Sequence, residues 1–186
     1  MSTSARRKPS ASAPMAYPMG PVSKASKVRE PVELASWPAR ASSFRALLRT
    51  APLTERVRIE REGVPYQVVK GLIDDVFESS ADFQVFVRIP KATFTKKMRD
   101  KALFGGTPGQ SVVGLMELIN KVEDMLAAET DNGEARNFDV QKWVGEWIQR
   151  PQPALGGLAP AELMDTPSGR ASVMHVLGAI QSGAYQ

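Results

Sequence analysis

The feature that most constrains the fold of this chain is the spacing of its apolar residues, which repeats with the period of an α-helix. Over residues 138–149 the apolar positions form the pattern i, i+3, i+4, i+7, i+8, which is one face of a helix. These positions are Val140, Trp143, Val144, Trp147 and Ile148. Residues 107–128 carry a second stripe, made of Val112, Leu115, Met116, Ile119, Val122 and Leu126. Because such stripes bury against other helices, the sequence predicts a helical core.

Proline and small polar residues indicate where the predicted helices begin. Thr107-Pro108 and Thr166-Pro167 each place a capping residue before a proline, which favours a helix start. Asn137 can cap the helix that follows it, and Pro160 opens a short helix that runs through Met164. Further helices are predicted over residues 42–49, from 65 to about 77, and over 91–102.

Residues 81–89 do not follow the helical pattern. Apolar residues alternate with polar ones there, and β-branched residues are frequent, which favours a strand by propensity. The residues of this segment alone therefore leave helix and strand both open.

The scarcity of cysteine and histidine excludes several classes of enzyme. The chain contains no cysteine, which excludes disulfides, thiolate metal sites and cysteine nucleophiles, and its one histidine is His175. His175 lies in a helical stretch, where a place on the helix surface or at the core edge is expected. Asp74 and Asp75 are adjacent, and neighbouring residues on a helix point about 100° apart, so they do not form an acid–base pair. We expect no catalytic residue, no metal and no cofactor, and therefore a protein that is not an enzyme.

The hydropathy pattern contains no run of about 18 apolar residues, so we expect no membrane span and a cytoplasmic location. Residues 1–35 are rich in Ser, Ala, Pro, Lys and Arg, and show no apolar period. This composition predicts a disordered basic tail, either a solvated leader without a role or a segment that attracts phosphates.

The net charge of +4 is distributed unevenly along the chain. Residues 1–62 carry a net +7 and residues 88–101 a net +5, whereas residues 63–87 and 102–186 carry −3 and −5. The basic N-terminal part and the acidic C-terminal part of the chain indicate partners of opposite charge, with a polyanion at the basic end.

The predicted helix over residues 91–102 has the composition of a DNA-reading helix. Threonines near its start can reach bases or phosphates, and cations along one face can reach phosphates or guanine. The candidate DNA-binding residues are Lys91, Thr93, Thr95, Lys96, Lys97, Arg99 and Lys101. An exposed basic helix without a ligand is the alternative interpretation of the same residues.

The last third of the chain carries a specific ordered set of residues. It consists of Trp143, Arg150, the run from Pro151 to Gly157, Pro160, Glu162-Leu163-Met164, Gly169, Val176-Leu177 and the end from Ile180 to Tyr185. This set closely resembles the toxin-binding domain of the Xre/MbcA/ParS antitoxins. Upstream, Glu62-Gly63-Val64-Pro65 resembles the entry into that family's helix-turn-helix, and residues 89–97 resemble its recognition helix.

The resemblance implies an all-α fold with three parts. Residues 1–52 would be the basic tail with a possible short helix, 53–104 an Xre-like helix-turn-helix module, and 105–186 a helical dimerisation and toxin-binding domain. It also implies a helix across residues 82–87, in place of the strand that propensity favours. Two positions depart from the family: Arg88 stands where its turn usually has glycine, and Ala159 where a threonine cap is common.

The function that the resemblance implies is inhibition of a RES-domain toxin, which consumes NAD or transfers ADP-ribose, and repression of the chain's own operon. The expected partners are this toxin, operator DNA and a second copy of the chain. The implied toxin-binding residues are Arg150, Pro153, Ala154, Leu155, Gly156, Gly157, Gly183, Ala184 and Tyr185. Two alternatives stay open, namely an antitoxin without operator binding and a solitary helix-turn-helix regulator.

Overall fold

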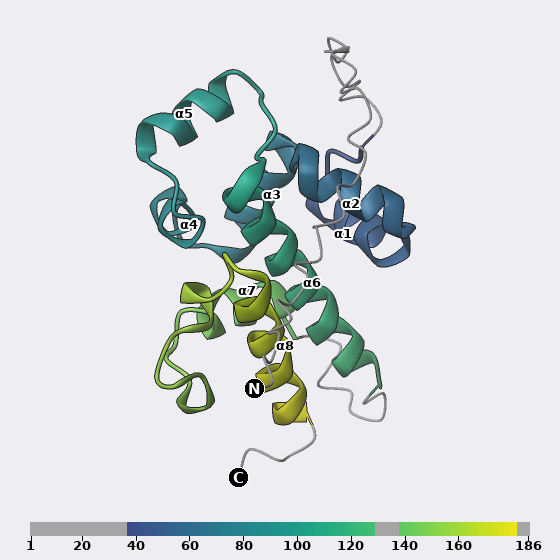
Figure 1. The fold of residues 1–186 in the computed structure, drawn as a ribbon, viewed down its shortest axis with the longest axis vertical. Coiled ribbons are helices and arrows are strands. Elements are labelled where there is room, and N and C mark those ends of the chain that lie inside the picture. Colours follow the sequence, from purple (N-terminus) through teal and green to yellow (C-terminus); the bar gives the residue numbers. More distant parts are fainter. Residues whose placement is uncertain (1–36, 129–137, 182–186) are drawn as a thin grey trace, which may run out of the picture. The chain divides into compact units, whose positions relative to one another are not determined.

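The computed structural model describes residues 37–128 and 138–181, and these residues are helical, which confirms the predicted all-α fold (Figure 1). The α-helices are α1 (Ala41–Thr50), α2 (Leu53–Glu62), α3 (Tyr66–Val76), α4 (Ser80–Phe86), α5 (Lys91–Arg99), α6 (Gly106–Ala128), α7 (Val140–Trp147) and α8 (Pro167–Gln181). Two short 3-10 helices, η3 (Pro153–Leu155) and η4 (Pro160–Glu162), lie between α7 and α8. The predicted disordered tail, residues 1–35, lies outside the described residues.

The long helix α6 is the centre of the core, and α1, α2, α7 and α8 all pack against it (Figure 1). The stripe predicted for this helix is buried, with only Leu126 partly exposed. Its burial extends beyond one face, because Val113, Gly114 and Leu118 are buried as well. A helix that is apolar on most sides belongs in the interior, where it organises its neighbours.

Helix α1 is the helix predicted for residues 42–49, and it belongs to this core. Phe44 and Leu48 are buried, and the ring of Phe44 meets the ring of Trp37 edge-on with 6.2 Å between centroids. Because α1 packs against α3 and α6, the folded part of the chain begins well before residue 53.

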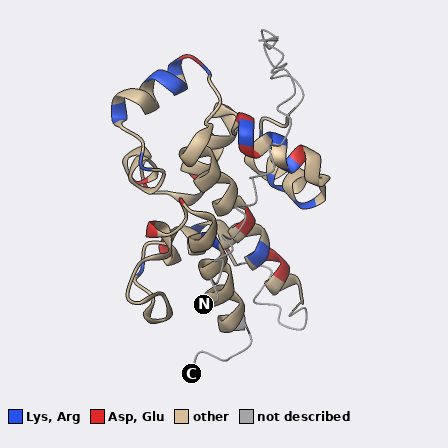
Figure 2. Cartoon of the chain, viewed as in Figure 1, with Lys and Arg blue, Asp and Glu red and all other residues tan. Residues whose placement is uncertain are grey.

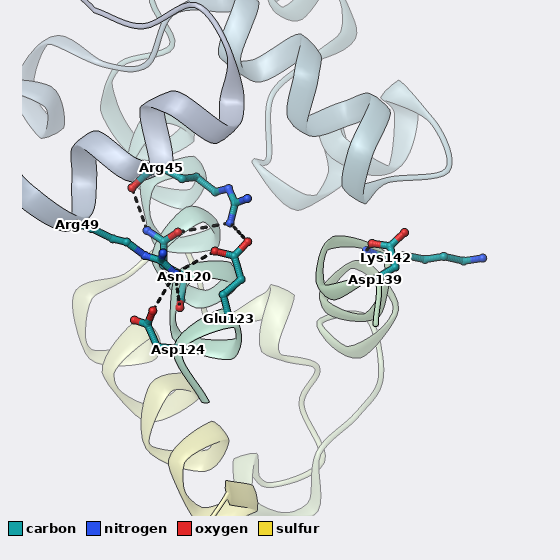
Figure 3. A network of polar contacts seen from close by, with 7 residues as sticks. All are labelled: Arg45, Arg49, Asn120, Glu123, Asp124, Asp139 and Lys142. Atoms are coloured by element: carbon teal, nitrogen blue, oxygen red, sulfur yellow. Dashed lines mark hydrogen bonds and ion pairs between the residues drawn. The ribbon is translucent and has the colours of Figure 1, made fainter. Parts of the chain in front are cut away.

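A polar network fastens α1 to the last turns of α6 (Figure 3). Arg45 Nη1 lies 2.6 Å from Glu123 Oε1, and the Nδ2 of Asn120 donates to the carbonyl of Arg45 at 3.1 Å. Arg49 Nη2 lies 2.9 Å from both Glu123 Oε2 and Asp124 Oδ1. Arg45 and Asn120 are buried, and these contacts satisfy Arg45 Nη1 and the side-chain amide of Asn120, which would otherwise be costly to bury, while Arg45 Nε has no hydrogen-bond partner.

The segment with strand propensity forms helix α4, as the family resemblance implied. Its apolar residues Phe83 and Phe86 are three positions apart, so a helix turns both to the core, where a strand would place them on opposite faces. Both rings lie close to the ring of Phe77, with centroid distances of 5.6 and 5.5 Å. Burial of these aromatic rings thus outweighs the local preference for a strand.

Helices α4 and α5 end in the same hydrogen-bonded motif. After α4, the amides of Arg88 and Ile89 donate to the carbonyls of Val85 and Gln84 at 3.1 and 3.0 Å. After α5, those of Lys101 and Ala102 donate in the same way to residues 98 and 97. This Schellman motif requires a residue with positive φ, usually glycine, and here Arg88 and Lys101 both adopt a φ of 52°. The motif ends α5 at Arg99, three residues earlier than predicted.

The boundaries of the remaining helices differ slightly from the predictions. Asp139, whose carboxylate accepts from the amide of Lys142 at 3.0 Å, caps α7, whereas the predicted cap Asn137 lies outside the described residues. The short helix at Pro160 is a single 3-10 turn. Thr166 caps α8 as predicted, because its Oγ1 accepts from the amide of Gly169 at 3.1 Å.

Candidate functional site

Helix α5 presents the predicted basic face to solvent. Its anchor is Phe94, which is buried and lies 6.0 Å, between ring centroids, from both Phe83 and Phe104. The candidate residues exposed around this anchor are Lys91, Thr93, Thr95, Lys96, Arg99 and, after the helix, Lys101. Figure 2 shows these cations along α5. An exposed row of cations and hydroxyls on a short helix can contact phosphates and base edges.

Lys97 differs from the other candidates because it is partly buried and bonded within the fold. Its Nζ donates to the carbonyl of Leu103 at 2.8 Å and lies 5.6 Å from the ring centroid of Phe104. The side chain of Lys97 therefore helps to hold the segment after α5. Arg99 pairs with Asp100 at 2.9 Å, and its hydrogen bond lowers the pKa of the Asp100 carboxyl.

Residues 150–158 form a compact turn between α7 and η4, which we call the glycine turn. Gln152 closes it: its amide donates to the carbonyl of Leu158, and its own carbonyl accepts from the amides of Leu155 and Gly157, each at 3.0 Å. The amide of Ala161 donates to the carbonyl of Ile148 at 2.8 Å, which ties η4 to the end of α7. Hydrogen bonds therefore close the turn and tie the segment after it to the end of α7.

Both glycines of this turn occupy the left-handed region, with φ of 68° at Gly156 and 83° at Gly157. An added Cβ would meet nothing within 4 Å at either position. These glycines therefore serve the conformation of the backbone, and the space in front of them is open to a partner.

The structure distributes the predicted toxin-binding residues between the surface and the core. Arg150, Pro153 and Ala154 are exposed. Leu155 packs against the core, whereas Leu158, which the sequence did not single out, is 43% exposed. Gly183, Ala184 and Tyr185 lie outside the described residues.

Sequence reasoning also missed the role of Gln152. Its position between two prolines was the available signal, because neither flanking residue has an amide hydrogen with which to close the turn. Arg150 forms an exposed pair with Glu146 at 2.8 Å, one helical turn before it.

The histidine and the aspartate pair considered above for chemistry lie on different helices. His175 is exposed on α8, and no group of three or more His, Asp or Glu side chains among the described residues could hold a metal ion. A cleft of about 300 Å³ between α3 and α7 contains Asp74 and Asp75. Partial burial, and then the neighbouring Asp74, raise the pKa of the Asp75 carboxyl.

In the described part of the chain, no helix is both long and apolar enough to cross a membrane.

Comparison with protein families identifies the region that contains the glycine turn. Residues 136–183 match the model of the "Antitoxin Xre/MbcA/ParS C-terminal toxin-binding domain". This match covers α7, η3, η4 and α8, and therefore every described candidate toxin-binding residue.

Two curated relatives extend the similarity over most of the chain. The chain is 32% identical over 143 residues to the Prs ADP-ribosylating antitoxin of Sphingobium sp. (strain YBL2), an alignment that covers 77% of this chain and 87% of the relative. It is 22% identical over 125 residues to Antitoxin Xre of Photorhabdus laumondii subsp. laumondii, covering 67% of this chain and 77% of the relative. The protein with this helical core and this glycine turn belongs to the Xre/MbcA/ParS family of antitoxins.

Proposed function

We propose that this antitoxin neutralises a RES-domain toxin, which consumes NAD or transfers ADP-ribose, by covering the toxin's active site. The observation that carries the proposal is the hydrogen-bonded, exposed glycine turn inside the region that matches a toxin-binding domain. The name of the Sphingobium relative, which refers to ADP-ribosylation, supports the chemistry of the toxin. The proposed contacts are Arg150, Pro153, Ala154, Gly156, Gly157, Gly183, Ala184 and Tyr185, with Leu155 supporting the turn from behind.

Leu158 is added to these contacts on structural grounds. An exposed leucine beside two glycines can enter an apolar pocket while the backbone approaches the partner closely. Because the turn is already closed by its own hydrogen bonds, little conformational entropy is lost when a toxin binds it.

We also propose that the antitoxin represses its own operon through α5. The helix-turn-helix would consist of α4, the turn at residues 87–90, and α5, whose exposed threonines and cations would face the major groove. A homodimer is expected, because two reading heads match a two-fold operator.

An antitoxin that neutralises its toxin without binding an operator is the second candidate. The observation that favours it is the side chain of Lys97, which is bonded to Leu103 and so is not extended toward DNA. Membership in the antitoxin family argues against the alternative of a solitary regulator.

Co-expression with the protein encoded by an adjacent reading frame tests the toxin-binding proposal. We expect rescue of growth and a complex that co-purifies, and a Gly156→Val, Leu158→Asp double variant should lose both. Failure of the folded wild-type chain to rescue or to bind would contradict the proposal. Titration of the protein against DNA from its own promoter separates the two candidates, since only the repressor gives a salt-sensitive shift.

A further inference from the structure

The turn between α4 and α5 contacts the loop between η4 and α8. Arg88 Nη1 lies 2.5 Å from Asp165 Oδ2, and Arg88 Nη2 donates to the carbonyl of Glu162 at 2.8 Å. The side chain of Asp165 is only 16% exposed, whereas that of Arg88 is 55% exposed, so only the carboxylate of the pair is shielded from water. Two hydrogen bonds from one guanidinium to the same loop, one of them to a charged acceptor, hold that loop more firmly than a single exposed pair does.

The backbone of Arg88 makes this contact unusual. Arg88 occupies the positive-φ position of the Schellman motif after α4, where glycine is the usual residue. A side chain at this position costs conformational energy that glycine would avoid. The contacts with Asp165 and Glu162 are what the arginine side chain provides in return.

These contacts join the two surfaces to which functions were assigned above. Arg88 lies three residues before the first candidate DNA-binding residue, Lys91. Its acceptors, Glu162 and Asp165, follow the glycine turn by four and seven residues, on a segment that the amide of Ala161 fastens to Ile148. A partner seated on the glycine turn therefore lies beside the loop that holds Arg88 and restricts the motion of that loop.

We propose that Arg88 is a positioning residue that couples toxin binding to the recognition helix α5. The inference rests on the proposed function. A bound toxin immobilises the loop at residues 160–165, this loop holds Arg88, and Arg88 holds the start of α5 in place. Toxin binding then slows the opening of α5 and tightens operator binding, and by thermodynamic linkage operator DNA tightens toxin binding equally.

Hydrogen exchange of the α5 amides tests the contact in the free protein. Asp165→Asn removes the charge without touching the turn, and Arg88→Asn keeps a residue that tolerates positive φ but cannot reach Asp165. Each variant should speed α5 exchange by about threefold to tenfold, and the double variant should exchange no faster than the single variants. Arg61→Ala, which alters an exposed arginine on α2, is the matched control and should leave α5 exchange unchanged.

The second arm uses the toxin identified by co-expression. In the wild type, toxin binding should slow α5 exchange by about fivefold or more, and in both single variants by less than about twofold. A normal complex that leaves wild-type α5 exchange unchanged overturns the coupling alone. The coupling is also overturned if Arg88→Asn changes α5 exchange and Asp165→Asn does not, because the change would then come from the backbone conformation at residue 88 and not from the contact with Asp165. Absence of any complex refutes the proposed toxin binding as well.

Discussion

Gly145 shows how closely two helices of this protein approach each other. A Cβ built on Gly145 in α7 would lie 2.0 Å from the carbonyl oxygen of Val76, at the end of α3. Because this obstacle is backbone, it cannot rotate away as a side chain could. The close approach fixes α7, the first helix of the toxin-binding region, directly against α3.

Replacing Gly145 with alanine should therefore destabilise the protein. We expect a loss of about 1–3 kcal/mol in the free energy of unfolding, the usual cost of overpacking. Gly178→Ala on α8 is the matched control, since a Cβ there meets nothing within 4 Å. It should be neutral or should stabilise by up to about 1 kcal/mol, because alanine is the better helix former. Denaturant unfolding measures both, and equal effects would contradict the close approach.

Helix α5 is followed by a residue that has a positive φ but is not glycine. Lys101 adopts a φ of 52° with its amide bonded to Met98, in the position that glycine fills most easily. Its side chain is exposed, whereas the side chain of Arg88, at the same position after α4, is bonded to Asp165.

Lys101→Gly should consequently stabilise the end of α5. We expect the free energy of unfolding to rise by up to about 1 kcal/mol, because glycine adopts positive φ without a steric penalty. Lys96→Gly is the control, as it places glycine inside the same helix and should cost about 1 kcal/mol. Thermal unfolding followed by circular dichroism distinguishes them, and a loss of stability in both would show that residue 101 is not strained.

The pairing of α2 with α6 should make stability depend on pH. Burial raises the pKa of the Glu117 carboxyl above its usual 4.5, although Arg56, which is bonded to it, acts in the opposite direction. The folded state therefore holds the Glu117 proton more tightly than the unfolded state does. The contribution of this group to stability falls as the pH rises through the interval above 4.5.

Glu117→Gln removes this dependence and keeps the size of the side chain. We expect the stability of the variant relative to the wild type to be greater at about pH 8 than at about pH 4, measured as urea midpoints. An unchanged difference between the two pH values would show that Glu117 keeps its ordinary pKa in the fold.

Most of the helices could be predicted, although α2 was missed, whereas most of their ends and contacts could not. The stripe of α6 was evident from the spacing of its apolar residues, because that spacing is local. The helix at α4 contradicted propensity, since it depends on Phe77, Phe94 and Phe104, which lie outside the segment itself. The glycine turn was evident as a motif, whereas the exposure of Leu158 and the packing of Leu155 depend on how it closes.

At the scale of the whole molecule, the two proposed functions use different residues and should be separable. Lys96 and Arg99 are exposed on α5, and Leu158 is exposed on the glycine turn. A Lys96→Ala, Arg99→Ala variant should weaken operator binding and lower its salt dependence by about one unit for each phosphate that is no longer neutralised, while rescue from the toxin persists. Leu158→Asp should have the reverse effect.

Electrophoretic shifts at several salt concentrations and growth rescue together measure this separation. Lys97 is left unchanged because its bond to Leu103 makes it a part of the fold. If either variant is as stable as the wild type and yet loses both activities, the assignment of one function to each surface is refuted.

The docking of α1 has a consequence for how this antitoxin can be shortened. Phe44 and Leu48 fill the interior, and Arg45 places a cation there that Glu123 neutralises. A version that begins at Leu53 would lose these apolar groups and leave Glu123 without its buried partner. Truncations made for crystallisation should therefore keep Trp37, which packs against Phe44, and everything after it.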